Sequence, residues 1–212
     1  MNPNVYTRPA KSLRVRRQAE IQEVFFETIP TTSEPLMLGA SSECHVTPPA
    51  VATRMVAALE AKTDGRARVL EPSAGTGNLL SALINAGYRP EKLTAVELDY
   101  TLKTHLEGHF RGVNTLHGCF LAPMAEIDDC GGFHRIVMNP PFRKVKQHMN
   151  RALSLLADGT ADSPAVLVAL VPITYQHSGA EILEELPGDT FATCTVNTKI
   201  VRFKKTGKRT VL

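Results

Sequence analysis

The segment VLEPSAGTGNLL, residues 69–80, constrains the fold more than any other part of the chain. A short apolar run ends in a carboxylate, Glu71, and a turn of small residues leads through Gly75 and Gly77 into a leucine-rich run. Small residues in such a turn let the backbone approach a ligand, and the following helix presents free amide groups to anionic parts of it. The segment therefore predicts a strand, a ligand-binding loop and a helix.

The spacing of the two glycines does not match the common phosphate-binding loops. Gly77 is followed by Asn78, Leu79 and Leu80, so the third glycine of the dinucleotide fingerprint is missing, as is the Gly-Lys-Ser/Thr ending of a nucleotide P-loop. A carboxylate at the strand end would repel a pyrophosphate, whereas it suits the ammonium group of an amino-acid-bearing cofactor.

A second carboxylate supports this interpretation. Glu97 ends the run LTAVE, about 20 positions beyond the second glycine, which is the place from which an acid can hold both hydroxyls of a ribose. The two acids and the glycine turn together predict a site for a nucleoside with a charged amino-acid tail.

From residue 46 onward, apolar strands alternate with segments of helical spacing. The expected helices are residues 48–61, 79–86, 102–110, 147–156 and a segment around 181–186; the expected strands are 67–72, 93–99, 115–117, 133–139 and 165–172. Strands separated by helices predict a doubly wound, mostly parallel α/β sheet. Residues 191–205 alternate in polarity about a central Asn197, so we expect a strand pair joined by a turn and an antiparallel end to the sheet.

The third motif is IVMNPPF, residues 136–142, at the end of an expected strand. Proline lacks an amide hydrogen, so Pro140 and Pro141 leave carbonyl oxygens, beside the amide of Asn139, as acceptors for an amino group. Such acceptors direct the nitrogen lone pair toward an electrophile, and Phe142 is placed to stack on a flat base. A rigid turn with a core phenylalanine is the alternative, which the flanking Asn139 and Phe142 disfavour.

Composition and charge describe a folded chain with basic segments. Of the 212 residues, 43% are hydrophobic and 21% are charged, as expected for a soluble globular protein. The formal net charge is +3, and the lysines and arginines gather at residues 8–17, 143–151 and 202–209, runs that contain no acid. These runs are suited to phosphate contacts or to solvation alone.

The ends and the cysteines indicate compartment and organisation. Residues 1–40 differ from the rest and predict a basic arm with an amphipathic helix at 12–28 and a linker, followed by one domain at 41–212.

The four scattered cysteines predict neither a disulfide framework nor a zinc site. No signal peptide or membrane-spanning stretch is apparent, so the reducing cytoplasm is the expected compartment.

With TPPAVATRMV at residues 47–56, these motifs resemble those of the S-adenosylmethionine-dependent amino-methyltransferases, in particular the adenine-specific DNA methyltransferases of the gamma motif order. The resemblance covers about residues 41–205. It implies a Rossmann-like class I methyltransferase fold, S-adenosylmethionine as cofactor, S-adenosylhomocysteine as product, and methyl transfer to the 6-amino group of adenine in DNA. The chemistry is a direct displacement that needs no metal.

The resemblance also implies roles for individual residues. It assigns catalytic positions to Asn139, Pro140, Pro141 and Phe142. It assigns cofactor-binding positions to Thr47, Pro48, Glu71, Ser73, Gly75, Gly77, Glu97, Cys119, Phe120 and Asn139. Gly118, Cys119 and Phe120 stand where the family often has Gly-Asp-Phe, so adenine binding is expected to depend on Phe120 and the backbone. His45 and His148 are candidates for contact with the substrate, although single histidines are more often structural or surface residues.

The acceptor and the partners stay open at this point. The same chemistry on RNA, at adenine or the guanine 2-amino group, or on a protein glutamine is an alternative, and so is a nucleic-acid-binding protein without turnover. DNA-modifying relatives usually carry a separate target-recognition domain, for which 212 residues leave no room. We therefore expect weak sequence selectivity or a partner protein that supplies specificity; the sequence does not indicate the oligomeric state.

Overall fold

The computed structural model describes residues 46–60, 65–191 and 196–207. The predicted basic arm at residues 1–40 and His45 lie outside the described residues. Where the chain is described, no helix is long and apolar enough to cross a membrane.

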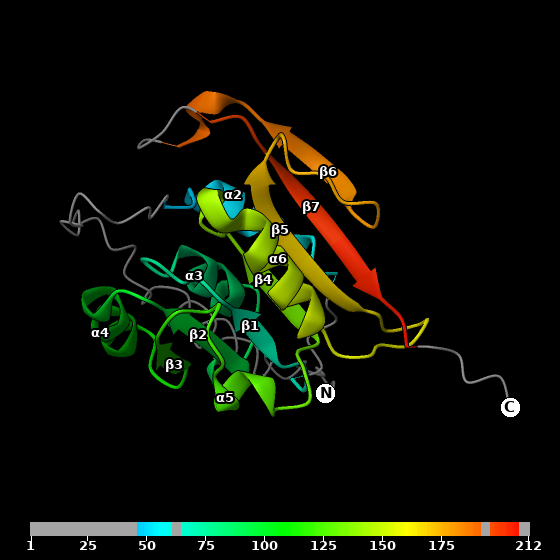
Figure 1. Cartoon of the computed structure of the whole chain (residues 1–212). Coiled ribbons are helices and arrows are strands. Elements are labelled where there is room, and N and C mark those ends of the chain that lie inside the picture. The colour runs from blue at the N-terminus through cyan, green and yellow to red at the C-terminus, as the bar shows by residue number, and fades with distance from the viewer. Residues whose placement is uncertain (1–45, 61–64, 192–195, 208–212) are drawn as a thin grey trace, which may run out of the picture. The chain divides into compact units, whose positions relative to one another are not determined.

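One seven-stranded sheet forms the centre of the described chain, in the order β3-β2-β1-β4-β5-β7-β6 (Figure 1). The strands are β1 (Val69–Glu71), β2 (Leu93–Glu97), β3 (Asn114–His117), β4 (Arg135–Met138), β5 (Ala165–Pro172), β6 (Glu181–Leu186) and β7 (Thr198–Lys205). The first five strands are parallel, and β7 pairs antiparallel with both β5 and β6. The order reverses between β1 and β4, and such a switch point is where open α/β sheets bind ligands.

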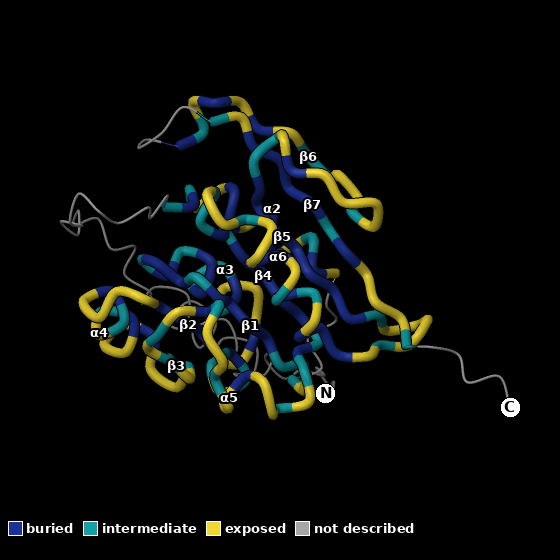
Figure 2. Tube along the Cα trace, in the orientation of Figure 1, coloured by how far each residue is buried: buried dark blue, intermediate teal, exposed yellow. Residues whose placement is uncertain are grey.

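Helices cover both faces of the sheet, as the crossovers between parallel strands require. They are α2 (Pro49–Ala57), α3 (Asn78–Asn85), α4 (Tyr100–His109), α5 (Ala125–Asp128) and α6 (Val145–Ser154), with short 3-10 helices η1 (Pro90–Lys92), η2 (Phe142–Lys144) and η3 (Gly188–Thr190). Apolar residues of α2, α3 and α4 pack in one core cluster, and those of α5 and α6 in the other. Alternate residues of the central strands point to the two clusters, so β5 is buried almost throughout (Figure 2).

The structure confirms the predicted mostly parallel α/β sheet with an antiparallel end. It also confirms the strand, loop and helix predicted from residues 69–80, as β1, the glycine turn and α3. Strand and helix limits differ from those expected by a few residues, because element ends are weakly specified by local pattern.

The prediction of a helix around residues 181–186 is wrong. These residues form β6, an edge strand that pairs with β7 through an irregularity between Ile182 and Glu184. A helix this short is marginal in water, whereas the open edge of β7 supplies hydrogen-bond partners for an extended segment. Of the strand pair expected at 191–205, the second half is β7; residues 192–195 lie outside the described residues.

Candidate functional site

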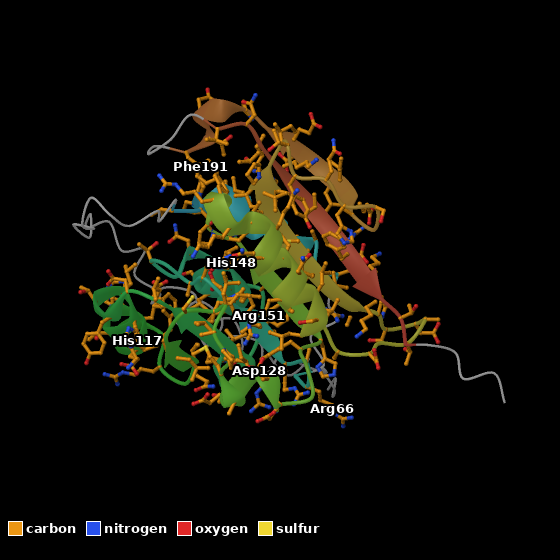
Figure 3. The ribbon with its side chains drawn as sticks, viewed as in Figure 1. Arg66, His117, Asp128, His148, Arg151 and Phe191 are labelled. Carbon is orange, nitrogen blue, oxygen red and sulfur yellow. The ribbon has the colours of Figure 1, made fainter. Side chains whose placement is uncertain are left out.

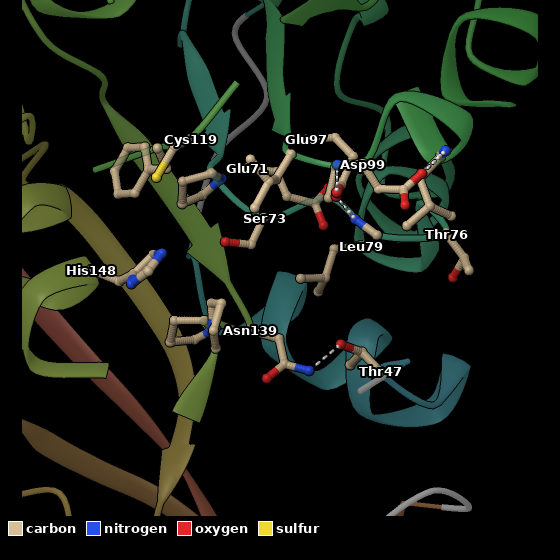
Figure 4. Close-up of a pocket in the computed structure, with 18 of the residues that line it drawn as sticks. Thr47, Glu71, Ser73, Thr76, Leu79, Glu97, Asp99, Cys119, Asn139 and His148 are labelled. Carbon is tan, nitrogen blue, oxygen red and sulfur yellow. Dashed lines mark hydrogen bonds between the residues drawn. The ribbon is translucent and has the colours of Figure 1, made fainter. Parts of the chain in front are cut away.

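A cavity of about 620 Å³ opens at the carboxyl ends of β1, β2 and β4, at the switch point of the sheet (Figure 4). It joins all the motifs singled out in the sequence. The predicted residues that line it are Thr47, Glu71, Ser73, Gly75, Glu97, Cys119, Phe120, Asn139, Pro140 and Pro141. In the view of Figure 4 the two carboxylates lie above the cavity, Asn139 and Thr47 below it, and His148 at the left.

Glu97 holds the glycine turn against the end of β2. Its Oε2 accepts a hydrogen bond from the Gly75 amide at 2.7 Å, and its Oε1 accepts one from the Asp99 amide at 2.8 Å. Gly75 has a φ of 55°, a left-handed conformation that glycine adopts without steric cost. A carboxylate oxygen has two lone pairs, so Glu97 retains capacity to accept hydroxyl donors from a ligand.

Glu71 lies at the end of β1 and is only 2% exposed. Burial is the main reason that its pKa is raised well above the ordinary value of 4.5; the nearby negative charge of Glu97 raises the pKa further, and a hydrogen bond from the Leu80 backbone opposes both. Its Oε2 is buried without a hydrogen-bond partner among the described residues. A buried carboxylate oxygen in this state favours a cationic partner.

Thr47, in the segment before α2, forms hydrogen bonds with residues of the glycine-turn segment and of the Asn-Pro-Pro-Phe motif. Its backbone carbonyl accepts a hydrogen bond from the Asn78 side chain at 2.8 Å, and its hydroxyl accepts one from Asn139 Nδ2 at 3.1 Å. Because the Asn139 amide nitrogen donates to Thr47, its carbonyl oxygen points the other way, as Figure 4 shows. Thr47 therefore orients the acceptor atom of Asn139.

Three predicted site residues do not line the cavity. These are Pro48, Gly77 and Phe142. A Cβ at Gly77 would lie 2.3 Å from a ring carbon of Phe110, so this glycine serves the packing of the turn on α4. Phe142 begins η2 and packs edge-on against Phe191, with ring centroids 6.3 Å apart.

The structure adds cavity residues that the motif reasoning missed. Leu98 and Asp99 directly follow Glu97, and the Asp99 side chain caps α4 by accepting from the Thr101 and Leu102 amides. Their position beyond a strand end was the signal that could have indicated them. Arg143 and Lys144, which the sequence indicates for phosphate contacts, also line the cavity. So does His148, for which the sequence gives substrate contact as the less favoured alternative.

The basic runs differ in how their charges are used. Arg202 pairs with Glu181 and Glu60, and Lys204 also pairs with Glu60, so this part of the C-terminal run is neutralised within the fold. Arg151 pairs with Asp128 at 2.9 Å; it shares α6 with His148 (Figure 3). Arg143 and Lys144 are exposed and line the cavity. Two basic side chains therefore lie where a polyanion at the cavity would meet them.

Comparison with family models and with curated proteins finds no match. Solved structures do match. A type I restriction-modification methyltransferase subunit from Streptococcus thermophilus superposes with a TM-score of 0.62 and 16% identity, over 77% of this chain and 45% of that one. A dimethyladenosine transferase from Plasmodium falciparum gives 0.57 and 14%, over 76% and 64%. An RNA methyltransferase from Salinibacter ruber, in complex with S-adenosyl-L-homocysteine, gives 0.52 and 14%, over 76% and 94%.

The chain spans less than two thirds of the length of the Streptococcus and Plasmodium proteins. At these identities the likeness concerns the backbone: a mostly parallel sheet with antiparallel strands at its C-terminal end. The chain has the Rossmann-like fold of the class I methyltransferases.

Proposed function

We propose that this chain is an S-adenosylmethionine-dependent methyltransferase that methylates the exocyclic 6-amino group of adenine in DNA. The observation that carries the proposal is that a single cavity joins Glu71, Gly75 and Glu97 with the acceptor side of Asn139 and Pro140. The first three residues suit an amino-acid-bearing nucleoside, and the last two suit an amino group.

The residues of the cavity fit S-adenosylmethionine. The Oε2 of Glu71, which is buried and has no hydrogen-bond partner in the described part of the chain, would face its ammonium group. Glu97 would accept from its ribose hydroxyls. Leu98, Leu102 and Phe120 give apolar surface for its adenine. When bound, the cofactor supplies an electrophilic methyl group on a positively charged sulfur.

The work of the chain's own residues would be alignment of the target nitrogen. Asn139 Oδ1 and the Pro140 carbonyl would accept the two hydrogens of the amino group, which draws its lone pair out of the ring and toward the methyl group. Thr47 would keep the Asn139 amide in the accepting orientation through its 3.1 Å hydrogen bond. Positioning of this kind lowers the barrier without a covalent intermediate.

Two kinds of observation support DNA adenine as the acceptor: the similar solved structures and the basic residues at the cavity. The similar solved structures include a restriction-modification methyltransferase subunit and a dimethyladenosine transferase, which favour nucleic acid and the adenine amino group. Arg143 and Lys144 at the cavity would contact phosphates, which position a protein on a nucleic acid without specifying sequence. We propose the same role for the basic arm at residues 1–40, and sequence selectivity would come from a partner protein.

RNA is the second candidate acceptor, favoured by the likeness to the Salinibacter RNA methyltransferase. The deciding experiment incubates the purified protein with radiolabelled S-adenosylmethionine and, separately, with unmethylated DNA, RNA and protein extract. We expect label in DNA that digests to N6-methyldeoxyadenosine. Label only in RNA or only in protein would show that this macromolecule, and not DNA, is the acceptor. Binding of S-adenosylmethionine without transfer to any of the three would favour a non-catalytic binding protein.

Replacing Glu71 by glutamine is expected to stabilise the free protein at neutral pH while weakening S-adenosylmethionine binding. Because the folded-state pKa of Glu71 is raised above 4.5, its contribution to stability is present at lower pH and is lost as the pH rises through the folded pKa. Glutamine carries no charge and avoids this loss. A hydrogen bond to a charged group contributes about 1.5 to 3 kcal/mol, so the affinity should fall at least about tenfold.

Thermal unfolding and titration calorimetry over a series of pH values measure both effects. The affinity of the wild type for S-adenosylmethionine should increase as the pH rises through the Glu71 pKa, because only the ionised carboxylate attracts the ammonium group. The Glu71→Gln variant should lack this increase. Equal affinity of both proteins at all pH values would remove Glu71 from the ammonium site.

A further inference from the structure

His148 is a cavity residue that the proposed roles of the other motifs leave unused. It lies on α6, which begins immediately after the Asn-Pro-Pro-Phe segment and η2, and it is only 6% exposed. It lines the same cavity as Asn139 and Glu71. Figure 4 shows its ring turned toward the space between Ser73 and Asn139. A polar ring buried at this place faces the region where the target amino group would be held.

The contacts of the ring determine which nitrogen carries the hydrogen. Nδ1 lies 3.1 Å from the carbonyl oxygen of Lys144. A carbonyl only accepts hydrogen bonds, so Nδ1 must donate, and in the neutral ring Nε2 then carries the lone pair. The Phe120 ring lies 5.9 Å away at an interplanar angle of 32° and limits rotation of the imidazole. His148 therefore offers a fixed acceptor nitrogen.

The surroundings keep the ring neutral. Burial is the main cause of a lowered His148 pKa; the positive charge of Lys144 lowers it too, while the hydrogen bond to the Lys144 carbonyl opposes them. The other titratable groups described around the cavity are Glu71, Glu97, Asp99, Cys119 and Arg143 on its wall, with Tyr175 in the neighbouring core cluster and Arg151 on the same helix. The Arg151 guanidinium lies over the ring of Phe120, the aromatic neighbour of His148, and is paired with Asp128.

We propose that His148 is a catalytic residue whose Nε2 takes up, as a proton, one of the two amino hydrogens first held by Asn139 Oδ1 and the Pro140 carbonyl; this inference rests on the proposed methyl transfer. As the new nitrogen–carbon bond forms, the carbon–sulfur bond breaks and its electron pair stays on sulfur. The nitrogen, which would otherwise become positively charged, gives one proton to Nε2. The imidazolium then releases this proton to water, so that charge and atoms balance.

Two variants at this position separate proton transfer from packing. His148→Phe keeps a flat ring beside Phe120 and removes the acceptor, and His148→Gln keeps a hydrogen-bonding group that cannot take up a proton near neutral pH. We expect kcat to fall about 100-fold in His148→Phe, as for the loss of a general base. The dissociation constant of S-adenosylmethionine should stay within about threefold of the wild type, since Nε2 faces the amine. His177→Phe is the matched control, because His177 stacks edge-on against Phe203 and lies outside the cavity.

The pH dependence of kcat gives a signature that packing does not produce. With the acceptor identified in the labelling experiment and both substrates saturating, kcat of the wild type should fall toward acid pH with an apparent pKa below 6.5, and neither His148 variant should show this decline. An NMR titration of the imidazole signals, assigned by comparison with His148→Gln, should give the same lowered pKa in the unliganded protein. A signal that also shifts when the acceptor is added would place the amine at the ring.

Three results would overturn the proposal. The first is a His148→Phe kcat within about threefold of the wild type, against the loss expected for a general base. The second is an acid decline that persists in His148→Gln. In both cases the methyltransferase function would stand without His148. The third is a wild-type protein that methylates no acceptor, which would overturn the proposed function and this inference together.

Discussion

Replacing Asn139 by alanine is expected to lower kcat for methyl transfer by about 100- to 1,000-fold, the usual loss when one preorganised hydrogen-bonding group is removed from a reacting centre. Asn139 lies at the carboxyl end of β4, and its Nδ2 donates to the Thr47 hydroxyl at 3.1 Å, which directs Oδ1 to accept from the target amine. Without this acceptor the lone pair of the amine stays conjugated with the ring. Single-turnover kinetics with labelled S-adenosylmethionine measure the loss in the chemical step.

The control for this variant is Asn150→Ala, which removes the same side chain from an exposed position of α6. Its kcat should equal that of the wild type. Asn139→Asp keeps an oxygen acceptor and should retain more activity than Asn139→Ala. A full rate in Asn139→Ala, with label still found in N6-methyldeoxyadenosine, would contradict the proposed role of this motif.

Replacing Gly77 by alanine is expected to destabilise the protein by about 2 to 5 kcal/mol, from left-handed backbone strain of about 1 to 2 kcal/mol and overpacking of about 1 to 3 kcal/mol. Gly77 precedes α3 with a φ of 87°. An added Cβ would lie 2.3 Å from Phe110 Cε2 and 2.9 Å from Leu106 Cδ2, so α4 would have to move. Urea unfolding followed by circular dichroism measures the change in the free energy of unfolding.

Gly87 offers a matched comparison, because its φ is 88° and an added Cβ would meet nothing within 4 Å. Gly87→Ala should therefore show the backbone strain alone, about 1 to 2 kcal/mol. The difference between the two variants measures the contact with Phe110 and Leu106. If Gly77→Ala is no less stable than Gly87→Ala, the turn does not depend on close packing against α4. The cofactor-binding role that the sequence assigns to Gly77 would then be favoured again.

Local patterns predicted much of the fold because strands and loops of this kind are encoded over short stretches. The apolar run ending at Glu71, the small residues of the turn and the leucines after them each favour the element that the structure shows. The segment at residues 181–186 was predicted as a helix because its composition is compatible with one. It is a strand because β7 lies alongside it, and that neighbour is not visible in the segment itself.

In the candidate site, too, some side-chain positions could be predicted from local sequence and others depend on tertiary neighbours. Residues at the carboxyl ends of parallel strands were expected to gather, and Glu71, Glu97 and Asn139 do line one cavity. Phe142 is predicted to stack on a base; in the structure it packs edge-on against Phe191 and is not among the residues that line the cavity. The direction of a side chain after two prolines depends on backbone geometry and on distant packing partners, which residue type alone does not specify.

The sequence by itself determined the doubly wound sheet, the glycine turn and the order of the three motifs, since each follows from contiguous residues and their periodicity. Only the tertiary structure decided which motif residues face the cavity. Thr47 and Asn139 are 92 positions apart and share a hydrogen bond. At Gly77 the Phe110 ring occupies the space that a side chain would need. His148 became a candidate proton acceptor because burial and the Lys144 carbonyl together fix its ring, and both depend on the folded chain.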